Sequence, residues 1–161
     1  MRASRVYVDT SVFGGCLDEE FATDSQRLFE EVRQGLHLLL VSDVVIRELQ
    51  AAPQAVQSIL LGLPRHFVLP VVVTAEIQAL CDEYLRAGVV GRRWIDDATH
   101  VAAATVARAD AIVSWNFQHI VHLDKMKAYN VVNLIQGYGF LTILTPKEVI
   151  EHGTDADEED I

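Results

Sequence analysis

The sequence predicts a single α/β domain of three layers, in which a central, mainly parallel, twisted sheet lies between helices. Short apolar runs alternate along the chain with segments of helical periodicity. Runs that are apolar at every position are typical of strands buried on both faces, as strands are in parallel sheets. The chain has 161 residues, 50% of them hydrophobic, which is enough for one domain with its own core.

The first half of the chain is expected to hold two strands and three helices. The apolar run at 5–8 predicts a strand, and two adjacent glycines predict a turn after it. Apolar residues at helical spacing, closed by a glycine, predict a helix at 24–34. The continuous run at 37–41 predicts a second buried strand. A Ser-Asp pair can cap a helix at 43–49, which a proline separates from a short helix at 54–62.

The second half continues the alternation. The run at 67–73 predicts an edge strand or a loop, because Pro70 cannot donate a hydrogen bond to a neighbouring strand. A threonine can cap a helix from 74 to about 87, an alanine-rich segment predicts a helix at 96–108, and 111–114 predicts a strand. The remaining expected elements are a helical stretch that follows residue 116 and continues past 129, a strand at 140–144 and a helix at 146–150.

Acidic residues outnumber basic ones by 23 to 13, a net charge of −10. This balance disfavours a nucleic-acid partner. Five of the acids lie within residues 155–160, however, and without them 13 basic and 18 acidic residues leave a charge of −5. Acids gathered in an active site would account for much of the remainder. We expect a domain at residues 1–152, followed by an acidic C-terminal tail at 153–161.

Cysteine content and hydropathy predict the compartment. Cys16 and Cys81 form neither a disulfide framework nor a metal-ligand spacing, which favours a reducing cytoplasm over secretion. No apolar run reaches the roughly 18 residues of a membrane span. A charged residue also stands where a signal peptide needs an apolar segment. We therefore expect a cytoplasmic protein with no membrane segment.

Polar residues near the ends of the expected strands are candidates for a site, because open α/β sheets bind ligands outside the carboxyl ends of their strands. Asp9 and Asn116 follow strands, while Glu48 and Asp97 lie on nearby helices. Singly, each acid has a plain interpretation as a turn cap, a surface residue or an acid favoured by a helix dipole. Their combination, in the order Asp, Glu, Asp, Asn, points to a site.

In these segments the sequence resembles the PIN domain family, best known from VapC-like toxins of toxin–antitoxin pairs. The resemblance covers about residues 5–150. The segments that carry it are Val-Tyr-Val-Asp-Thr-Ser-Val-Phe at 6–13, Ser-Asp-Val-Val-Ile-Arg-Glu-Leu at 42–49, Asp-Asp-Ala-Thr-His-Val-Ala-Ala-Ala at 96–104 and Ala-Ile-Val-Ser-Trp-Asn-Phe-Gln-His-Ile at 111–120. It implies a PIN-like fold, an RNA substrate and a small antitoxin as partner.

The resemblance also implies that Asp9, Glu48 and Asp97 bind Mg²⁺ or Mn²⁺ in a metal-dependent ribonuclease. The physics agrees, since clustered carboxylates repel one another unless a hard cation neutralises them. Asn116 is included among the catalytic residues, although the family commonly has a fourth acid there. Its carbonyl can coordinate a metal or position a water, but it supplies no charge. The alternative is a catalytically impaired PIN-like module that binds RNA or protein.

Three further residues are expected to support the site. Ser11 either orients Asp9 or is a plain turn hydroxyl. Asp96 could compensate for the missing acid, but neighbouring helix positions point about 100° apart, so only one of the two easily faces the site. The spacing of Asp97 to the alanines fits the family motif, so the resemblance places Asp97 in the site. His100 shares the helical face of Asp97 and either hydrogen-bonds a carboxylate or phosphate, or packs in the interior.

RNA-binding and self-association surfaces are also suggested. Arg92, Arg93 and Trp115 are candidates to grip phosphate and stack on a base, unless they are surface arginines and a core tryptophan. His119 and His122 lack a third ligand at zinc-like spacing. A homodimer is expected through the apolar stripe Leu28, Phe29 and Val32, unless that stripe packs on the sheet.

Overall fold

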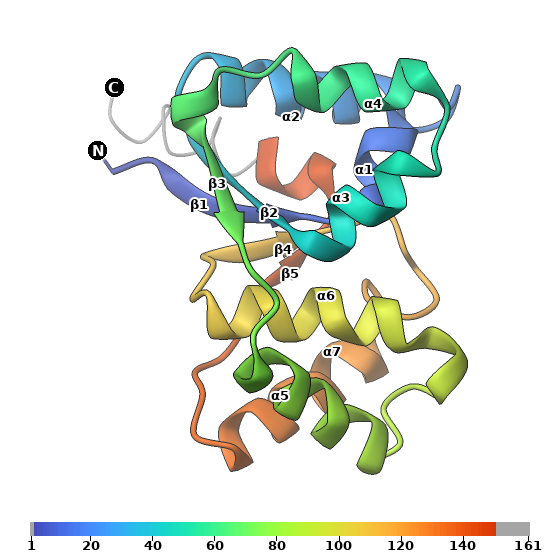
Figure 1. Cartoon of the computed structure of the whole chain (residues 1–161), viewed down its shortest axis with the longest axis vertical. Helices are drawn as coiled ribbons and strands as arrows, with labels where there is room; N and C mark the ends of the chain where they lie inside the picture. Colours follow the sequence, from blue (N-terminus) through green and yellow to red (C-terminus); the bar gives the residue numbers. More distant parts are fainter. Residues whose placement is uncertain (1, 151–161) are drawn as a thin grey trace.

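The five strands of the sheet all run parallel, in the order β3-β2-β1-β4-β5 (Figure 1). The computed structural model describes residues 2–150. The strands are β1 (Ser4–Val8), β2 (His37–Ser42), β3 (Val68–Val71), β4 (Ala111–Val113) and β5 (Ile143–Leu144). Consecutive residues of β1 from Val6 to Val8 are all buried, so both faces of the sheet are covered. The predicted three-layer α/β/α fold is confirmed.

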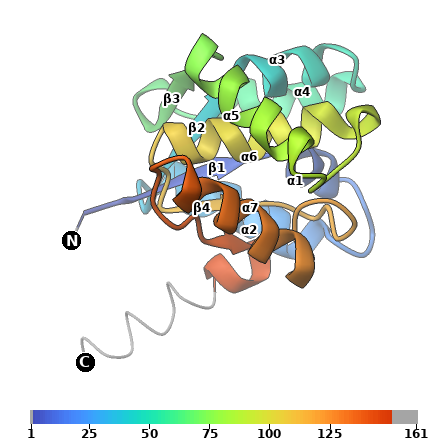
Figure 2. The same cartoon turned by 90° about the horizontal axis from the view of Figure 1, so that it is seen from below.

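Helices pack on both faces of the sheet. They are α1 (Thr10–Gly15), α2 (Ala22–Arg33), α3 (Asp43–Gln50), α4 (Gln54–Leu61), α5 (Ala75–Arg86), α6 (Ile95–Val106) and α7 (Leu123–Ile135), with short 3₁₀ turns η1 (Arg65–Phe67) and η2 (Arg92–Trp94). Figure 1 shows α1 to α4 on one side of the sheet and α5 to α7 on the other, and Figure 2 shows the same layers from below. Residues 146–150 are also helical, as expected.

The order of the strands reverses at β1. The chain moves outward from β1 through β2 to β3, then returns to the other side of β1 with β4 and β5. Right-handed crossovers then place the later helices on the opposite face. Val8 at the end of β1 lies beside Val113 at the end of β4, so the residues that follow these two strands meet where open α/β sheets bind their ligands.

The strands and two of the loops differ in detail from expectation. Pro70 lies in the edge strand β3, as predicted, but β3 and β5 are shorter than the apolar runs at 67–73 and 140–144. The stretch after residue 116 becomes helical only at Leu123. Gly14 and Gly15 lie in α1 rather than in a turn.

Two surface expectations have different outcomes. Leu28, Phe29 and Val32 on α2 are at most 1% exposed, so this stripe packs in the core and cannot form a dimer contact. The homodimer stays a prediction, without the surface that suggested it.

Within residues 2–150, no helix is long and apolar enough to span a membrane. The acidic tail at 153–161 lies outside the described residues.

Gly15 is required by a close approach between α1, α2 and the segment after β4. A β-carbon at Gly15 would lie 2.7 Å from Ser25 Oγ and 2.8 Å from Trp115 Nε1, two atoms that are hydrogen-bonded to each other. Both distances are shorter than van der Waals contact, so the tryptophan would have to move.

We therefore expect Gly15→Ala to lower the free energy of unfolding by about 1–3 kcal/mol, the usual cost of overpacking. Urea denaturation of this variant would measure the loss. Gly14→Ala is the matched control, because a β-carbon at Gly14 meets no atom within 4 Å. Equal stability of the two variants would contradict the close approach.

Candidate active site

Asp9 occupies the junction between β1 and β4 and is only 3% exposed. It precedes α1, yet its carboxylate caps no helix N–H, which excludes the turn-cap interpretation. The Ser11 hydroxyl donates to Oδ1 at 2.5 Å, and the Ser114 hydroxyl donates to Oδ2 at 2.9 Å. Each serine oxygen in turn accepts a backbone N–H, from Trp115 and Asn116 respectively. The predicted supporting role of Ser11 therefore has a geometric basis, and Ser114 matches it on the other side.

Glu48 lies on α3 and is held from two sides. His100 Nε2 lies 2.6 Å from Glu48 Oε1, and the Thr10 hydroxyl donates to the same oxygen at 3.0 Å. The other ring nitrogen of His100 lies 2.7 Å from the Tyr7 hydroxyl, which lies 2.6 Å from the Ser42 hydroxyl. His100 is thus both buried and bonded to a carboxylate, so it combines the two interpretations that its sequence position allowed.

Asp97 lies in the first turn of α6 and is joined to Asn116. The Asn116 side chain hydrogen-bonds the Asp97 carboxylate. Its Oδ1 accepts the backbone N–H groups of Gln118 and His119, at 3.2 and 2.9 Å. Because these two donors occupy the amide oxygen, the amide NH₂ is the group that faces Asp97. Asn116 therefore meets Asp97 through its amide nitrogen, and its expected role toward a metal or a water stays a prediction.

Asp96 points away from the site. Its carboxylate forms a salt bridge of 2.6 Å with Arg47, and both side chains are about half exposed. The choice of Asp97 over Asp96, which the resemblance favoured, agrees with this arrangement. Asp96 is engaged by Arg47, and its supporting role stays a prediction.

The carboxylates at the sheet edge are poorly solvated and close enough to repel one another. Burial raises the pKa of Asp9, the charge of Asp97 adds to the rise, and the positive charge of His100 and two serine hydroxyls oppose it. Burial likewise raises the pKa of Asp97, and the charge of Glu48 adds to that rise, against the charges of His100 and His119. Both groups would be stabilised as carboxylates by an additional positive charge.

The pKa values of Glu48 and His100 shift in opposite directions, as expected for two groups that are hydrogen-bonded to each other. Burial alone would raise the pKa of Glu48, but the hydrogen bond and charge of His100 outweigh it, and the pKa is lowered. Burial alone would lower the pKa of His100, but the hydrogen bond to Glu48 and the charges of Asp9, Glu48 and Asp97 raise it. The imidazole therefore partly offsets the negative charge of the cluster.

The donor set suits a hard cation that keeps most of its water. Within residues 2–150, no group of three or more His, Cys, Asp or Glu side chains could by itself hold a metal ion. Mg²⁺ commonly binds through only one or two carboxylates and several waters. Among the described residues, no cationic side chain lies at ion-pair distance from the carboxylates of Asp9 and Asp97, so the residues fit an Mg²⁺-like ion better than a metal enclosed by protein ligands.

The candidate RNA-binding residues lie in two different environments. Arg92 and Arg93 are exposed on η2, just before Asp97, and the Arg93 guanidinium lies 5.0 Å from the centre of the Trp94 ring. Trp115, in contrast, stacks on Phe21 with ring centres 4.3 Å apart. Its indole N–H is also bonded to Ser25. Trp115 is therefore largely a packing residue, as the alternative interpretation stated.

Two residues at this edge, Tyr7 and Ser114, were not singled out from the sequence. Tyr7 bonds to His100 and Ser114 bonds to Asp9, but a tyrosine inside a strand and a serine at its end give no signal of their own. His119 is 8% exposed, packs on Trp94, and has neither ring nitrogen hydrogen-bonded within the described chain. Phe117 lies beside Phe21 and is half exposed, so its ring is more open to solvent than the ring of Trp115.

Comparison with known proteins establishes the fold. No protein-family model and no curated protein matches the chain. Among solved structures, a chain of VapBC2 from Rickettsia felis, bound to a DNA fragment from their promoter, superposes with a TM-score of 0.54. The match covers 88% of this chain and 98% of that one, with 12% sequence identity. The chain has a PIN-like fold. At this sequence identity the similarity shows the fold alone, and it does not show an activity.

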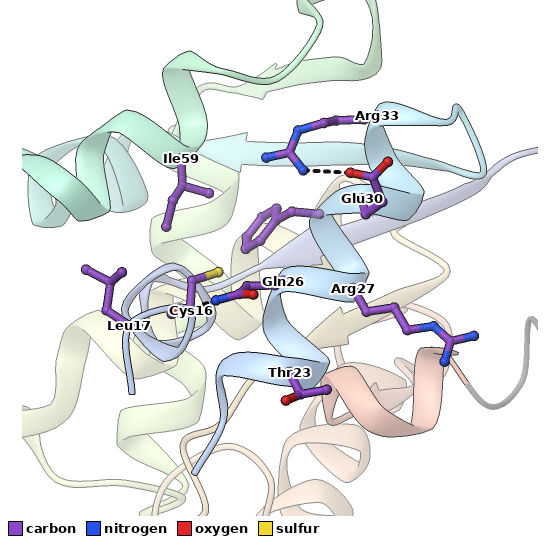
Figure 3. Close-up of a pocket in the computed structure, with 9 residues that line it drawn as sticks. Cys16, Leu17, Thr23, Gln26, Arg27, Glu30, Arg33 and Ile59 are labelled. Carbon is purple, nitrogen blue, oxygen red and sulfur yellow. Dashed lines mark hydrogen bonds and ion pairs between the residues drawn. The ribbon is translucent and has the colours of Figure 1, made fainter. Parts of the chain in front are cut away.

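A pocket of about 640 Å³ lies elsewhere on the PIN-like domain, between the end of α1, α2 and α4 (Figure 3). Leu17 and Ile59 contribute apolar side chains, and Arg33 is paired with Glu30 across the pocket wall. None of the four candidate catalytic residues lines it. The pocket is therefore separate from the acidic cluster.

We expect Mn²⁺ to raise the melting temperature of the wild type, because a ligand that binds only the folded state stabilises it, by about 2.7 kcal/mol at one hundred times Kd. Asp9→Asn should abolish most of this rise in thermal-unfolding experiments. Ser58→Ala, a change on the exposed side of α4, is the control. An equal rise in all three proteins would exclude a metal site at Asp9.

The pH dependence of the same variant follows from the raised pKa of Asp9. The folded protein holds this proton more tightly than the unfolded chain, so ionisation of Asp9 lowers stability as pH rises through the folded pKa. Metal-free Asp9→Asn lacks that loss and should become more stable relative to the wild type between acidic and neutral pH.

Asn116→Asp should lower the Mn²⁺ concentration needed for half-maximal stabilisation about tenfold, or ~1.4 kcal/mol. The new carboxylate adds a negative charge beside Asp97 and replaces the amide whose hydrogen bond now lowers the pKa of Asp97. For the same reason the metal-free variant should melt below the wild type. Thermal unfolding over a Mn²⁺ series would measure both effects, and an unchanged requirement would mean that Asn116 only supports its loop.

Proposed function

We infer that this protein is a metal-dependent ribonuclease that hydrolyses RNA phosphodiester bonds at the acidic cluster. The observation that carries the proposal is the buried Asp9 carboxylate, held by two serine hydroxyls at the junction of β1 and β4 and electrostatically coupled to Asp97. A structural carboxylate at this position would be expected to have a cationic side chain as partner. This one has hydroxyl donors, a neighbouring acid and a pKa that stays raised although the charge of His100, which is hydrogen-bonded to Glu48, opposes the rise.

Asp9 and Asp97 are the residues that would hold Mg²⁺ or Mn²⁺, with Glu48 contributing the oxygen that His100 does not occupy. Such a cation would lower the pKa of a water and offset the negative charge of the phosphate. The residues of the chain orient the carboxylates: the serines fix Asp9, His100 and Thr10 fix Glu48, and Asn116 fixes Asp97.

RNA would approach along the surface that carries η2. Arg92 and Arg93 are exposed and precede the helix of Asp97 by one turn, so they can contact phosphates on either side of the bond to be cut. Trp94 is half-buried beneath Arg93, which limits it to supporting the guanidinium. The exposed Phe117 is a better placed stacking surface than Trp115.

The proposed setting is the cytoplasm, and the proposed partner is a small antitoxin protein. The fold similarity to VapBC2, which was solved with a DNA fragment from their promoter, supports such a partner. A homodimer is part of the same proposal, although the α2 stripe cannot form it.

A second candidate function is an RNA- or protein-binding module without catalysis. It is favoured by Asn116, which brings an amide where a fourth acid would strengthen metal binding. Within residues 2–150 it is also favoured by the lack of three ligands able to enclose an ion. The two functions differ in their dependence on the carboxylates, since binding needs cations and stacking surfaces whereas hydrolysis needs a metal.

We expect the purified protein to cut single-stranded or structured RNA with Mg²⁺ or Mn²⁺ and to stop when a chelator is added. Asp97→Asn should end cleavage while RNA affinity stays equal or rises, because a negative charge near the phosphates is removed. Arg92→Ala with Arg93→Ala should instead weaken binding and reduce its salt dependence. Cleavage of a pooled RNA library, with filter binding in parallel, measures these effects.

Asp96→Asn is the matched control for contaminating ribonuclease and for loss of helix charge. It removes an acid from the adjacent position of α6, but one that faces Arg47 rather than the cluster. This variant should cut RNA within a few-fold of the wild-type rate. A wild type that binds RNA but cuts none of the library with either metal would establish the binding module instead.

A further inference from the structure

A chain of hydrogen bonds crosses the interior of the domain and ends on Glu48. It runs from Ser42 to Tyr7 (2.6 Å), from Tyr7 to His100 Nδ1 (2.7 Å) and from His100 Nε2 to Glu48 Oε1 (2.6 Å). Its first three members are at most 2% exposed. They belong to β2, β1 and α6, while Glu48 lies on α3, so the chain ties four elements together at one end of the sheet.

The hydrogen bonds of this chain can be oriented consistently with either charge of the imidazole. A carboxylate only accepts, so His100 Nε2 carries a proton and donates it to Glu48. With a neutral ring, Ser42 donates to Tyr7 and Tyr7 donates to Nδ1. With a charged ring, Nδ1 donates to Tyr7, which then donates to Ser42. The bond to Glu48 has the same direction in both states, so its orienting effect does not depend on the charge of the ring.

Glu48 needs such a partner, because its side chain has three rotatable bonds and is 32% exposed. Among residues 2–150, both hydrogen bonds to its carboxylate end on Oε1, from His100 and from Thr10. Oε2 is thereby left to a ligand. Two donors on one oxygen fix the plane of the carboxylate as well as its position.

We propose that His100, held in place by Tyr7 and Ser42, is a positioning residue that fixes Glu48 through Oε1 and reserves Oε2 for a divalent cation. This role rests on the proposed function for what the cation does, but it is a property of the protein without RNA. It gives two buried strand residues, Tyr7 and Ser42, a role in holding His100 in addition to their packing in the sheet.

The test is Mn²⁺ affinity, measured by calorimetry in the absence of RNA. His100→Asn keeps an amide near the place of Nδ1 but cannot reach Glu48, and should weaken binding about 10- to 100-fold, as outer hydrogen-bond partners of metal sites do. His100→Gln extends its amide toward the place of Nε2 and should recover most of the affinity. Loss of affinity in His100→Asn without recovery in His100→Gln would indicate a packing role and overturn the proposal.

Tyr7→Phe provides a variant that differs by one oxygen atom and keeps the buried ring. It should weaken Mn²⁺ binding by less than His100→Asn, because Glu48 keeps its donor but the donor loses its anchor. Tyr84→Phe is the matched control, since Tyr84 is equally buried and its hydroxyl bonds to Asn133, away from the acids. The two variants should lose similar stability, while only Tyr7→Phe changes Mn²⁺ affinity.

A double-mutant cycle tests whether His100 acts through Glu48. In a Glu48→Gln background, His100→Asn should cost little further affinity, because the side chain that it positions is already altered. Independent, additive losses would overturn the proposal. A wild type that binds Mn²⁺ but cuts no RNA would overturn the ribonuclease function alone, whereas equal Mn²⁺ affinity of His100→Asn and wild type would overturn the positioning role whether or not RNA is cut.

Discussion

Repulsion among three carboxylates at one edge of the sheet is the constraint that shapes this end of the molecule. Asp9 is buried and Asp97 and Glu48 are partly buried, so water screens their charges only weakly. The metal-free protein offsets the repulsion with hydrogen-bond donors of several kinds: serine hydroxyls at Asp9, an amide at Asp97 and an imidazole at Glu48. The donors come from three segments, α1, α6 and the residues after β4, so the carboxylates link these segments at one edge of the sheet.

The same repulsion between carboxylates explains why an amide at position 116 suits this edge of the sheet. A fourth carboxylate here would place another negative charge against Asp97 and would depend on a bound cation to be tolerated. The amide avoids this, because its oxygen accepts two backbone N–H groups and its nitrogen is left to donate to Asp97. Under the proposed function, an amide at position 116 would lower the affinity for a cation and favour stability of the fold without one.

Patterns in the sequence were sufficient to predict the layers, the parallel sheet and the convergence of the four motifs. Unbroken apolar runs identify strands buried on both faces, and the residues that follow such strands must meet at one edge. The pattern could not distinguish which polar atoms face one another. Asp96 and Asp97 are adjacent and chemically identical; the resemblance favours Asp97, but that Asp96 pairs with Arg47 is visible only in the structure. The role of Tyr7 is hidden for a similar reason, since a tyrosine inside a strand is first of all a core residue.

The expected dimer surface shows the opposite limit. An apolar stripe on a helix indicates only that something covers it, and in α2 that something is the sheet of the same chain. Apolar periodicity indicates that a helix face is buried, but it does not indicate what covers that face. Clustered acids are more informative, because carboxylates repel one another and are costly to bury. Residue types with a high cost of burial therefore predict a site more reliably than residue types that gain from burial.

The acidic character of the chain and the proposed RNA substrate are reconciled by where the charges lie. Under the proposed function, the acids of the site would repel phosphate until a cation is bound, so the cation would control approach as well as chemistry. The two arginines of η2 stand directly before the helix that carries Asp97, and they give the phosphate chain a local attraction that the net charge conceals. A site of this kind would bind RNA weakly without a metal ion and much more tightly once a metal ion is bound. That property follows from three carboxylates meeting at the end of β1.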